Sequence, residues 1–354
     1  MPAAAAIGLG ISVSRKWMDD AQGIRMLTWS RMRSSRDRVV ISKDASLMNR
    51  RDFNRLCMAL GSTVTLSGVS ALDAPAAETS AGRTVKFQDG IVVPVLGLGS
   101  AGLGQGRRPA GSEEEALRAG IALGMTLIDT SGDYGGGRSE QLISRAITGQ
   151  RDRVFLVSKV EADDVNGDGV ARACEASLGR LGTNYLDLYL LHWPVPSTKF
   201  PLLISSFEHL RTEGKIRAWG VSNFSVRQME DLFRIPKGDQ CATNQVPYSL
   251  DDRRIERDLL PWCARHNMPV MAYSPLGGPG ARVLRDPALA SIGAARGCSA
   301  AAVALAWTTR SGNVIAIPES GSVAHVKENA VALSLTLTPQ ELQTLDAAHP
   351  PPGK

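Results

Sequence analysis

The feature that most constrains this chain is a regular alternation of short apolar runs with helical stretches, which starts near residue 84. Eight short runs have the length and composition of strands. They are Val95–Gly99, Thr126–Asp129, Val154–Lys159, Leu186–His192, Ile216–Val221, Thr243–Val246, Val270–Tyr273 and Val314–Pro318. Segments with helical character lie between them, among them Glu113–Leu123, Ser139–Ile147, Gly169–Leu181, Ser225–Phe233 and Ala300–Arg310. This rhythm favours a parallel sheet whose strands are joined by helices.

Eight such units without a second domain predict an α/β fold, a (β/α)8 TIM barrel over residues 84–346, followed by a short tail at 347–354. A doubly wound open sheet is the alternative. Residues 84–94 have the pattern of a β-hairpin with its turn at Asp89-Gly90, so we expect the barrel to be opened by an N-terminal β-hairpin. In barrels of this kind the catalytic residues lie at the C-terminal ends of the strands.

The charge of the chain is concentrated at its N-terminal end. The 354 residues carry 40 lysines and arginines against 35 aspartates and glutamates, and residues 1–77 hold 11 of the former and 6 of the latter. The remainder is therefore neutral, with 29 charges of each sign, and gives no reason to expect a nucleic-acid partner. No apolar run reaches about 18 residues, so no stable membrane span is expected.

The five cysteines are widely spaced and match neither a zinc pattern nor a small disulfide scaffold. They are Cys57, Cys174, Cys241, Cys263 and Cys298. The four outside the leader could pair in three ways, but free buried thiols are the favoured interpretation.

Residues 48–77 have the three parts of a secretory signal. Arg50 and Arg51 stand immediately behind Met48, a weakly apolar stretch follows over 56–72, and small residues at 74–77 offer a cleavage site. The paired arginines resemble a twin-arginine (Tat) export signal, which implies the twin-arginine translocase as a partner and a periplasmic or secreted protein. Residues 1–47 are then expected to be disordered or a mis-annotated extension. A basic amphipathic helix or a disordered tail, with the protein cytoplasmic, is the alternative.

Polar side chains occur together at the ends of consecutive predicted strands. Asp129 and Tyr134 follow the second strand, Lys159 ends the third, and His192 ends the fourth. A tyrosine hydroxyl has a pKa near 10, and an adjacent ammonium is expected to lower it. A carboxylate can hold the lysine, and a histidine can donate a hydrogen bond to a carbonyl oxygen. Together the four could protonate a carbonyl oxygen while hydride reaches its carbon.

With these residues the chain resembles the aldo-keto reductase family, over residues 84–329. The motifs that carry the resemblance are DTSGDYG, VSKV, LLHWP, GVSNF, NQVPYS, AYSPLG and IPESGSVAHVKEN. The resemblance implies an oxidoreductase that reduces an aldehyde or ketone to an alcohol with NAD(P)H. It implies that Tyr134 is the general acid, that Lys159 polarises it, and that Asp129 holds the lysine. His192 would orient the small-molecule carbonyl substrate.

The resemblance also implies a set of cofactor contacts. Ser222, Asn223 and Gln245 match positions that hold the nicotinamide carboxamide, and Tyr273 matches the aromatic residue stacked on the nicotinamide ring. Ser274, Leu276 and Gly277 match the loop at the pyrophosphate, while Glu328 and Asn329 match contacts to adenine.

The sequence departs from the family at the expected site of the adenosine 2′-phosphate. The family's Ile-Pro-Lys-Ser is here Ile-Pro-Glu319-Ser320, and His325 stands where an arginine is common. A neutral histidine is a poor substitute for arginine, and a carboxylate repels a phosphate but can accept from a free ribose 2′-hydroxyl. We therefore expect a weakened NADPH preference, with NADH tolerated or preferred; Lys327 could compensate.

Fewer residues of the sequence indicate the shape of the substrate pocket. Ala101 replaces an aromatic residue often found after the first strand, and the tail and the loop after His192 are short. We expect a shallow, open pocket lined by Trp193 and Tyr248. The substrate itself is not specified by these residues.

Two further motifs are rejected because their context is wrong. Residues 97–102 match GxGxxG, but no helix opens on the last glycine, as a dinucleotide fingerprint requires. Residues 164–175 satisfy an EF-hand pattern, but a strand rather than a helix precedes them and there is no second hand. We interpret that segment as a strand-to-helix loop with Asp168 near the helix N-cap, and assign no metal site.

Three functions remain as hypotheses. An exported nicotinamide-dependent reductase is favoured by the intact set of four polar residues. A non-catalytic, nicotinamide-sensing protein on the same barrel is the alternative, since a fold does not determine a function. A calcium-binding exported module is the third.

Overall fold

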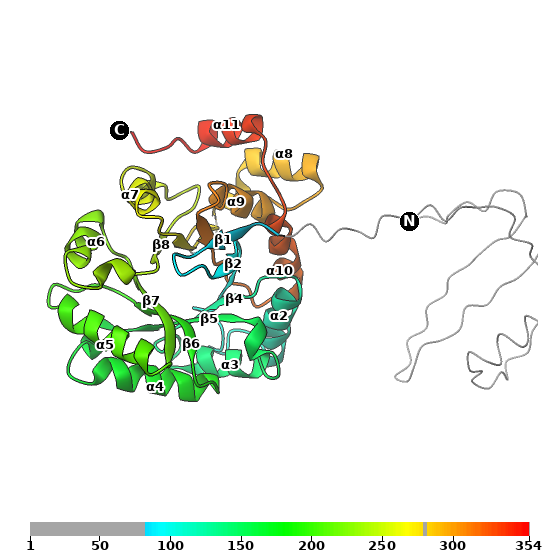
Figure 1. The fold of residues 1–354 in the computed structure, drawn as a ribbon. Helices are drawn as coiled ribbons and strands as arrows, with labels where there is room; N and C mark the ends of the chain where they lie inside the picture. The colour runs from blue at the N-terminus through cyan, green and yellow to red at the C-terminus, as the bar shows by residue number, and fades with distance from the viewer. Residues whose placement is uncertain (1–81, 279–281, 354) are drawn as a thin grey trace, which may run out of the picture. The chain divides into compact units, whose positions relative to one another are not determined.

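The computed structural model describes residues 82–278 and 282–353. The expected extension at 1–47 and the twin-arginine signal at 48–77 lie outside the described residues, so both stay predictions. Figure 1 shows the described part as a ring of helices around a central sheet.

Eight parallel strands form the central sheet, in the order β10-β9-β8-β7-β6-β5-β4-β3. They are β3 (Leu98–Gly99), β4 (Leu127–Asp129), β5 (Phe155–Val160), β6 (Leu186–Leu191), β7 (Ile216–Ser222), β8 (Asn244–Pro247), β9 (Val270–Tyr273) and β10 (Val314–Ala316). Parallel bridges from Leu96 to Ala316 and from Gly99 to Glu319 join the first strand to the last. The sheet therefore closes on itself, which confirms the predicted TIM barrel and excludes the open sheet.

The helices between the strands cover the outside of the sheet (Figure 1). They are α2 (Ala110–Ala122), α3 (Arg138–Ala146), α4 (Gly169–Leu181), α5 (Phe200–Thr212), α6 (Val226–Phe233), α7 (Leu259–Arg265), α8 (Pro287–Arg296), α9 (Ala300–Thr308), α10 (Val323–Ala330) and α11 (Pro339–Ala348). In the described part of the chain, no single helix has the length and apolar composition of a membrane span, although α8 and α9 reach both together across a bend of 100°.

An antiparallel hairpin of β1 (Thr84–Lys86) and β2 (Val92–Pro94) precedes the barrel, as predicted. Gly90, with φ of +90°, occupies the turn, a conformation that glycine adopts without steric cost. The apolar side chains of the hairpin join the cluster inside the barrel, and the ring of Phe87 stacks on that of Phe155 at 5.6 Å. Because Phe155 begins β5, the hairpin covers the N-terminal end of the strands and leaves the C-terminal end for the site.

The cysteines of the described residues are free thiols, as expected. Burial raises the pKa of Cys174 and of Cys263 to about 12. Such thiols stay protonated at neutral pH and are poor nucleophiles. The predicted signal's Cys57 lies outside the described residues.

Candidate active site

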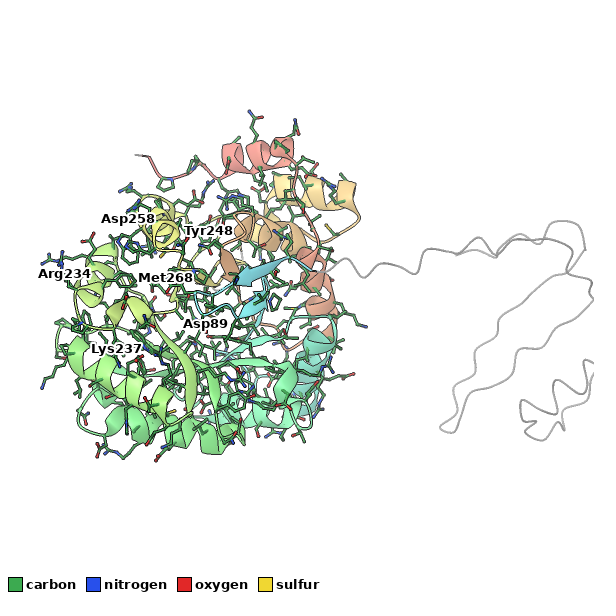
Figure 2. All side chains as sticks on the ribbon, viewed as in Figure 1. Asp89, Arg234, Lys237, Tyr248, Asp258 and Met268 are labelled. Atoms are coloured by element: carbon green, nitrogen blue, oxygen red, sulfur yellow. The ribbon has the colours of Figure 1, made fainter. Side chains whose placement is uncertain are left out.

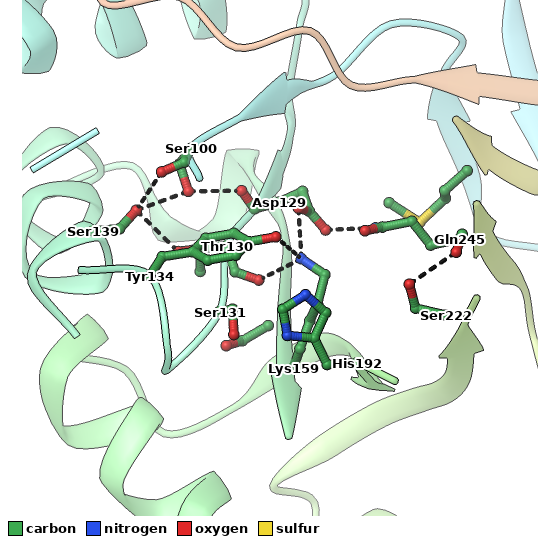
Figure 3. A network of polar contacts seen from close by, with 12 residues as sticks. Ser100, Asp129, Thr130, Ser131, Tyr134, Ser139, Lys159, His192, Ser222 and Gln245 are labelled. Atoms are coloured by element: carbon green, nitrogen blue, oxygen red, sulfur yellow. Dashed lines mark hydrogen bonds and ion pairs between the residues drawn. The ribbon is translucent and has the colours of Figure 1, made fainter. Parts of the chain in front are cut away.

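The polar residues predicted at the strand ends converge at the C-terminal end of the barrel. Asp129 is the last residue of β4, and Lys159 lies one residue before the end of β5. Tyr134 belongs to the loop between β4 and α3, where three glycines at 135–137 all have positive φ values. These glycines allow the chain to turn sharply behind the tyrosine, because they adopt left-handed conformations that other residues resist. Figure 3 shows the resulting group.

The ammonium group of Lys159 is the centre of this group. It donates hydrogen bonds to Asp129 Oδ2 at 2.7 Å, to the carbonyl oxygen of Thr130 at 2.9 Å and to the Tyr134 hydroxyl at 3.1 Å (Figure 3). Gln245 Nε2 donates to the other oxygen of Asp129 at 2.7 Å. All three protons of the ammonium thus have acceptors, and the tyrosine keeps its own proton free for another partner.

Charge and burial act in opposite directions on these groups. Burial alone would lower the pKa of Lys159, but the charges of Asp129 and Tyr134 outweigh it, so the pKa of the lysine lies above its ordinary value. Burial raises the pKa of Tyr134, and Lys159 offsets only part of that rise. The expected lowering of the tyrosine's pKa by the lysine is present, but burial outweighs it, so the pKa of Tyr134 lies above its ordinary value. Tyr134 is a neutral proton donor held beside a cation.

His192 follows β6 and faces the tyrosine. The two ring centroids lie 5.7 Å apart at an interplanar angle of 76°. Nδ1 of His192 lies 2.5 Å from Oε1 of Glu161, a residue that the sequence reasoning missed. A carboxylate at Nδ1 favours a proton on that nitrogen and fixes the orientation of the ring. The missed signal is the strand period of two: Glu161 continues the extended chain just after β5, so its side chain points to the same side as that of Lys159.

A cavity of about 460 Å³ opens above these residues. Among the predicted residues it is lined by Asp129, Tyr134, His192, Trp193, Ser222, Asn223, Gln245, Tyr273, Ser274, Leu276, Gly277 and Glu319. Ala101 also lines it and is exposed, and half of Trp193 (49%) is exposed at the wall. The cavity thus joins the proton-donating group to most of the predicted cofactor contacts.

Hydrogen bonds preorganise the wall opposite the tyrosine. Ser222 Oγ donates to the backbone oxygen of Gln245 at 2.8 Å, and Asn223 Nδ2 donates to that of His192 at 3.1 Å. The Tyr273 hydroxyl donates to Asn223 Oδ1 at 3.0 Å. Asn223 and Ser274 have φ values of +64° and +49°, which are costly for non-glycine residues and often occur at functional sites.

The residues predicted at the adenosine end lie in the loop after β10 and in α10. Glu319 lines the cavity, and the others lie outside it. Ser320 precedes α10, where its Oγ accepts from the Ser322 amide at 3.2 Å. His325 and Glu328 are exposed on α10, and Asn329 is buried. Burial raises the pKa of the Glu319 carboxyl, and the amide of Gly102 and the charge of Arg107 partly offset this.

Tyr248 does not line the cavity, so its prediction as a substrate contact is wrong. It is 2% exposed, donates a hydrogen bond to Glu256 Oε1 at 2.6 Å and accepts one from Arg310 Nη1 at 2.7 Å. Its ring packs against Trp307 at 5.4 Å. Tyr248, labelled in Figure 2, directly follows the last residue of β8, and its burial away from the cavity explains why a residue of the same motif as Gln245 misses the site.

The segment with the EF-hand pattern forms a short 3-10 turn at 162–164 and then α4. Asp168 is the residue before α4, as predicted, but its side chain makes no capping hydrogen bond. Across 82–278 and 282–353, no group of three or more histidine, cysteine, aspartate or glutamate side chains is arranged to hold a metal ion.

Known proteins are similar to this chain in sequence and in fold. The sequence model of the Aldo/keto reductase family matches residues 95–350. Methylglyoxal reductase YeaE of Escherichia coli K12 is 46% identical over 273 residues, which cover 76% of this chain and 96% of that protein. A crystal structure of an aldo/keto reductase from Klebsiella pneumoniae in complex with NADP and acetate is 44% identical, with a TM-score of 0.74, over 77% of this chain and 97% of that one. A thermostable aldo-keto reductase in complex with the inhibitor epalrestat is 36% identical, with a TM-score of 0.68, over 75% of this chain and 98% of that one.

Proposed function

Because this chain belongs to the aldo/keto reductase family, and is therefore an oxidoreductase that reduces carbonyl compounds with a nicotinamide cofactor, we propose that it reduces a small aldehyde with Tyr134 as the proton donor. The observation that carries this proposal is the chain of contacts from Asp129 through Lys159 to the Tyr134 hydroxyl. It leaves a protonated hydroxyl at the wall of a cavity, directly beside a buried positive charge.

The catalytic step follows from these positions. A substrate carbonyl oxygen accepts a hydrogen bond from Tyr134, and negative charge grows on that oxygen during reduction. Tyr134 transfers its proton to the oxygen, and the Lys159 ammonium stabilises the phenolate that remains. His192 lies close enough to Tyr134 to orient the same carbonyl oxygen. Proton transfer from a positioned general acid typically raises the reaction rate by about 10²–10⁴-fold.

The cavity residues fit a nicotinamide cofactor, which supplies the hydride when bound. Tyr273 presents an aromatic ring at the wall, and Ser222, Asn223 and Gln245 offer amide and hydroxyl groups beside it. Gly277, with φ of +85°, turns the loop at the edge of the cavity, where the backbone can approach a diphosphate. NADP or NADPH occupies the related Klebsiella structures.

We further propose that NADH is tolerated as a cofactor. Glu319 lines the cavity at the end where the adenosine ribose is expected, and its Oε1 has no hydrogen-bond partner among the described residues. A carboxylate oxygen in that position can accept a hydrogen bond from a free 2′-hydroxyl. Glu319→Ala is then expected to weaken NADH binding more than NADPH binding, as measured by fluorescence titration. Equal losses for both cofactors would contradict this assignment.

The size of the cavity supports a small substrate. About 460 Å³ has to hold both the nicotinamide end of the cofactor and the carbonyl compound. A two- or three-carbon aldehyde is small enough to share this cavity with that end of the cofactor, and the relative at 46% identity is a methylglyoxal reductase. A 2-oxoaldehyde such as methylglyoxal is therefore the substrate class we propose.

Steady-state reduction tests this proposal. The full chain is supplied with NADPH or NADH and with methylglyoxal or acetophenone, and oxidation of the cofactor is followed by absorbance. We expect kcat/KM for methylglyoxal to exceed that for acetophenone at least tenfold. A preference for the bulky ketone would overturn the substrate assignment, and tight cofactor binding without turnover of any carbonyl would favour a nicotinamide-sensing protein.

Export by the twin-arginine route remains part of the proposal, supported by Arg50 and Arg51 behind Met48. That route carries folded proteins, so a cofactor could travel inside the barrel. Fractionation of cells that produce the full chain tests it: the protein should reach the periplasm, and the double variant Arg50→Lys, Arg51→Lys should stay in the cytoplasm. Equal distribution of the two proteins would favour a cytoplasmic enzyme.

A further inference from the structure

Two arginines of one loop reach the segment where the family's phosphate-binding cations are missing. Arg107 and Arg108 lie between β3 and α2, more than 200 residues before that segment in sequence. Nη1 of Arg108 lies 3.2 Å from the point that a Cβ atom on Gly321 would occupy, and Cδ of the same arginine is equally close. Its guanidinium group therefore lies against the chain between Glu319 and the start of α10.

Arg107 approaches the same segment from the side of Gly102. Its Nη1 lies 3.2 Å from the position of a Cβ atom on Gly102, while Oε1 of Glu319 lies 2.6 Å from that position. The Gly102 amide donates to the other oxygen of Glu319 at 2.5 Å. The Gly102 amide thus ties the loop after β3 to the loop after β10, and Arg107 and Glu319 approach each other at Gly102.

Neither arginine has a carboxylate partner in the part of the chain that the structure describes. No ion pair within 4.0 Å involves Arg107 or Arg108 there, and the one side-chain hydrogen bond of Arg107 is a long one of 3.4 Å to Gln105. Arg253 and Arg310, by contrast, both contact Glu256. Two exposed guanidinium groups without carboxylate partners are free to bind a phosphate in a bidentate manner.

The negative charge of Glu319 is the main argument against a phosphate here. That charge is already partly compensated, because the Gly102 amide donates to it and both arginines interact with it favourably. Glu113 adds a second buried carboxylate nearby, with Oε2 bound to the Gly104 amide at 2.9 Å. The two cations balance the two carboxylates, so the adenosine end is not the anionic surface that residues 319 and 325 alone suggest.

We propose that Arg107 and Arg108 bind the adenosine 2′-phosphate of NADPH, in place of the cations absent at Glu319 and His325. This inference rests on the proposed cofactor site and adds to it a phosphate clamp from a different loop. It implies that one site accepts both cofactors, since Glu319 serves a free 2′-hydroxyl and the arginines serve a 2′-phosphate. The loss of NADPH affinity expected from Glu319 and His325 is then offset by the arginines of the loop after β3 rather than by Lys327.

Fluorescence titration of the full chain tests the clamp without depending on activity. Trp193 lines the cavity and reports binding there. Arg107→Ala and Arg108→Ala should each raise the Kd for NADPH about tenfold, and the double variant more, because each removes charge-assisted hydrogen bonds to the phosphate. The Kd for NADH should change less than twofold. Arg108→Lys keeps the charge and should lose less than Arg108→Ala.

A matched control separates the clamp from a general loss of positive charge. Arg172→Ala removes an exposed arginine of α4 that has no side-chain hydrogen bond or ion pair among the described residues, and it should leave both Kd values unchanged. Displacement of NADPH by adenosine 2′,5′-bisphosphate should also weaken in the double variant, whereas displacement by adenosine 5′-monophosphate should not. The affinity of the wild type for NADPH should fall with added salt more steeply than that of the double variant.

Three results would overturn the inference. Unchanged NADPH binding in the double variant would show that other groups hold the phosphate. Equal losses of NADPH and NADH would assign the arginines a structural role in the loop. Failure of the wild type to bind either cofactor at millimolar concentration would overturn the cofactor site itself, and the clamp with it.

Discussion

Nζ of Lys159 lies 2.7 Å from Oδ2 of Asp129, and both side chains are buried, with Asp129 at the wall of the cavity. The lysine could not remain charged at this depth without the carboxylate, because burial alone favours its neutral form. The pair therefore does more than stabilise the barrel: it keeps a positive charge beside the hydroxyl that donates the proton.

Asp129→Asn keeps the size of this side chain and removes its charge. The variant leaves a buried ammonium without a counter-charge, which typically costs about 3–5 kcal/mol of unfolding free energy. The pKa of Lys159 is raised above 10.5 in the folded protein, so the pair stabilises the fold below the lysine's unfolded pKa. That contribution is lost as pH rises through the folded pKa. Urea unfolding at neutral pH measures the loss, and equal unfolding free energies for the two proteins would contradict it.

Glu161→Gln tests the residue that contacts His192. Glu161 also raises the pKa of Tyr134, although less than burial does. The general acid must be protonated, so kcat/KM falls as pH rises through the pKa of Tyr134, which lies above 10.0 in the free enzyme. The variant should shift this alkaline limb to lower pH and should lower kcat through the loosened histidine. The exposed neighbour Asp163, changed to Asn, is the control, and identical pH profiles for all three proteins would sink the assignment.

Tyr248→Phe distinguishes a structural tyrosine from a substrate contact. The hydroxyl bridges Glu256 and Arg310 in a buried network, so its removal should cost about 1–3 kcal/mol of stability. KM for methylglyoxal should stay within a factor of two, because Tyr248 does not reach the cavity. Thermal unfolding and steady-state kinetics measure the two effects. A several-fold rise in KM with unchanged stability would restore Tyr248 to the substrate pocket.

The barrel and the catalytic group were predictable from the sequence because both follow from the local pattern of strands and helices along the chain. Strand length and alternation identify the eight strands, and parallel strands bring Asp129, Lys159 and His192 to one end whatever the details of packing. The hairpin was predictable for a similar reason, since Asp89-Gly90 determines its turn.

Other features depend on tertiary contacts, which the sequence pattern does not predict. The pKa of Tyr134 is set by burial as well as by Lys159, and the depth of a side chain is a tertiary property. Tyr248 shares a motif with Gln245, yet the two differ in position because the chain leaves β8 between them. Arg107 and Arg108 lie far from Glu319 in sequence, and only the closure of the barrel brings their loop beside it.

The measurement that tests the account most directly is single-turnover reduction of methylglyoxal by the full chain and by Tyr134→Phe, with cofactor binding measured on the same samples. The variant removes one hydroxyl and should leave the Kd for NADPH within twofold of the wild type. Its reduction rate should fall by about 10²–10⁴, the usual contribution of a positioned general acid. A variant that binds NADPH normally and reduces methylglyoxal within tenfold of the wild-type rate would contradict the role of Tyr134 as the proton donor.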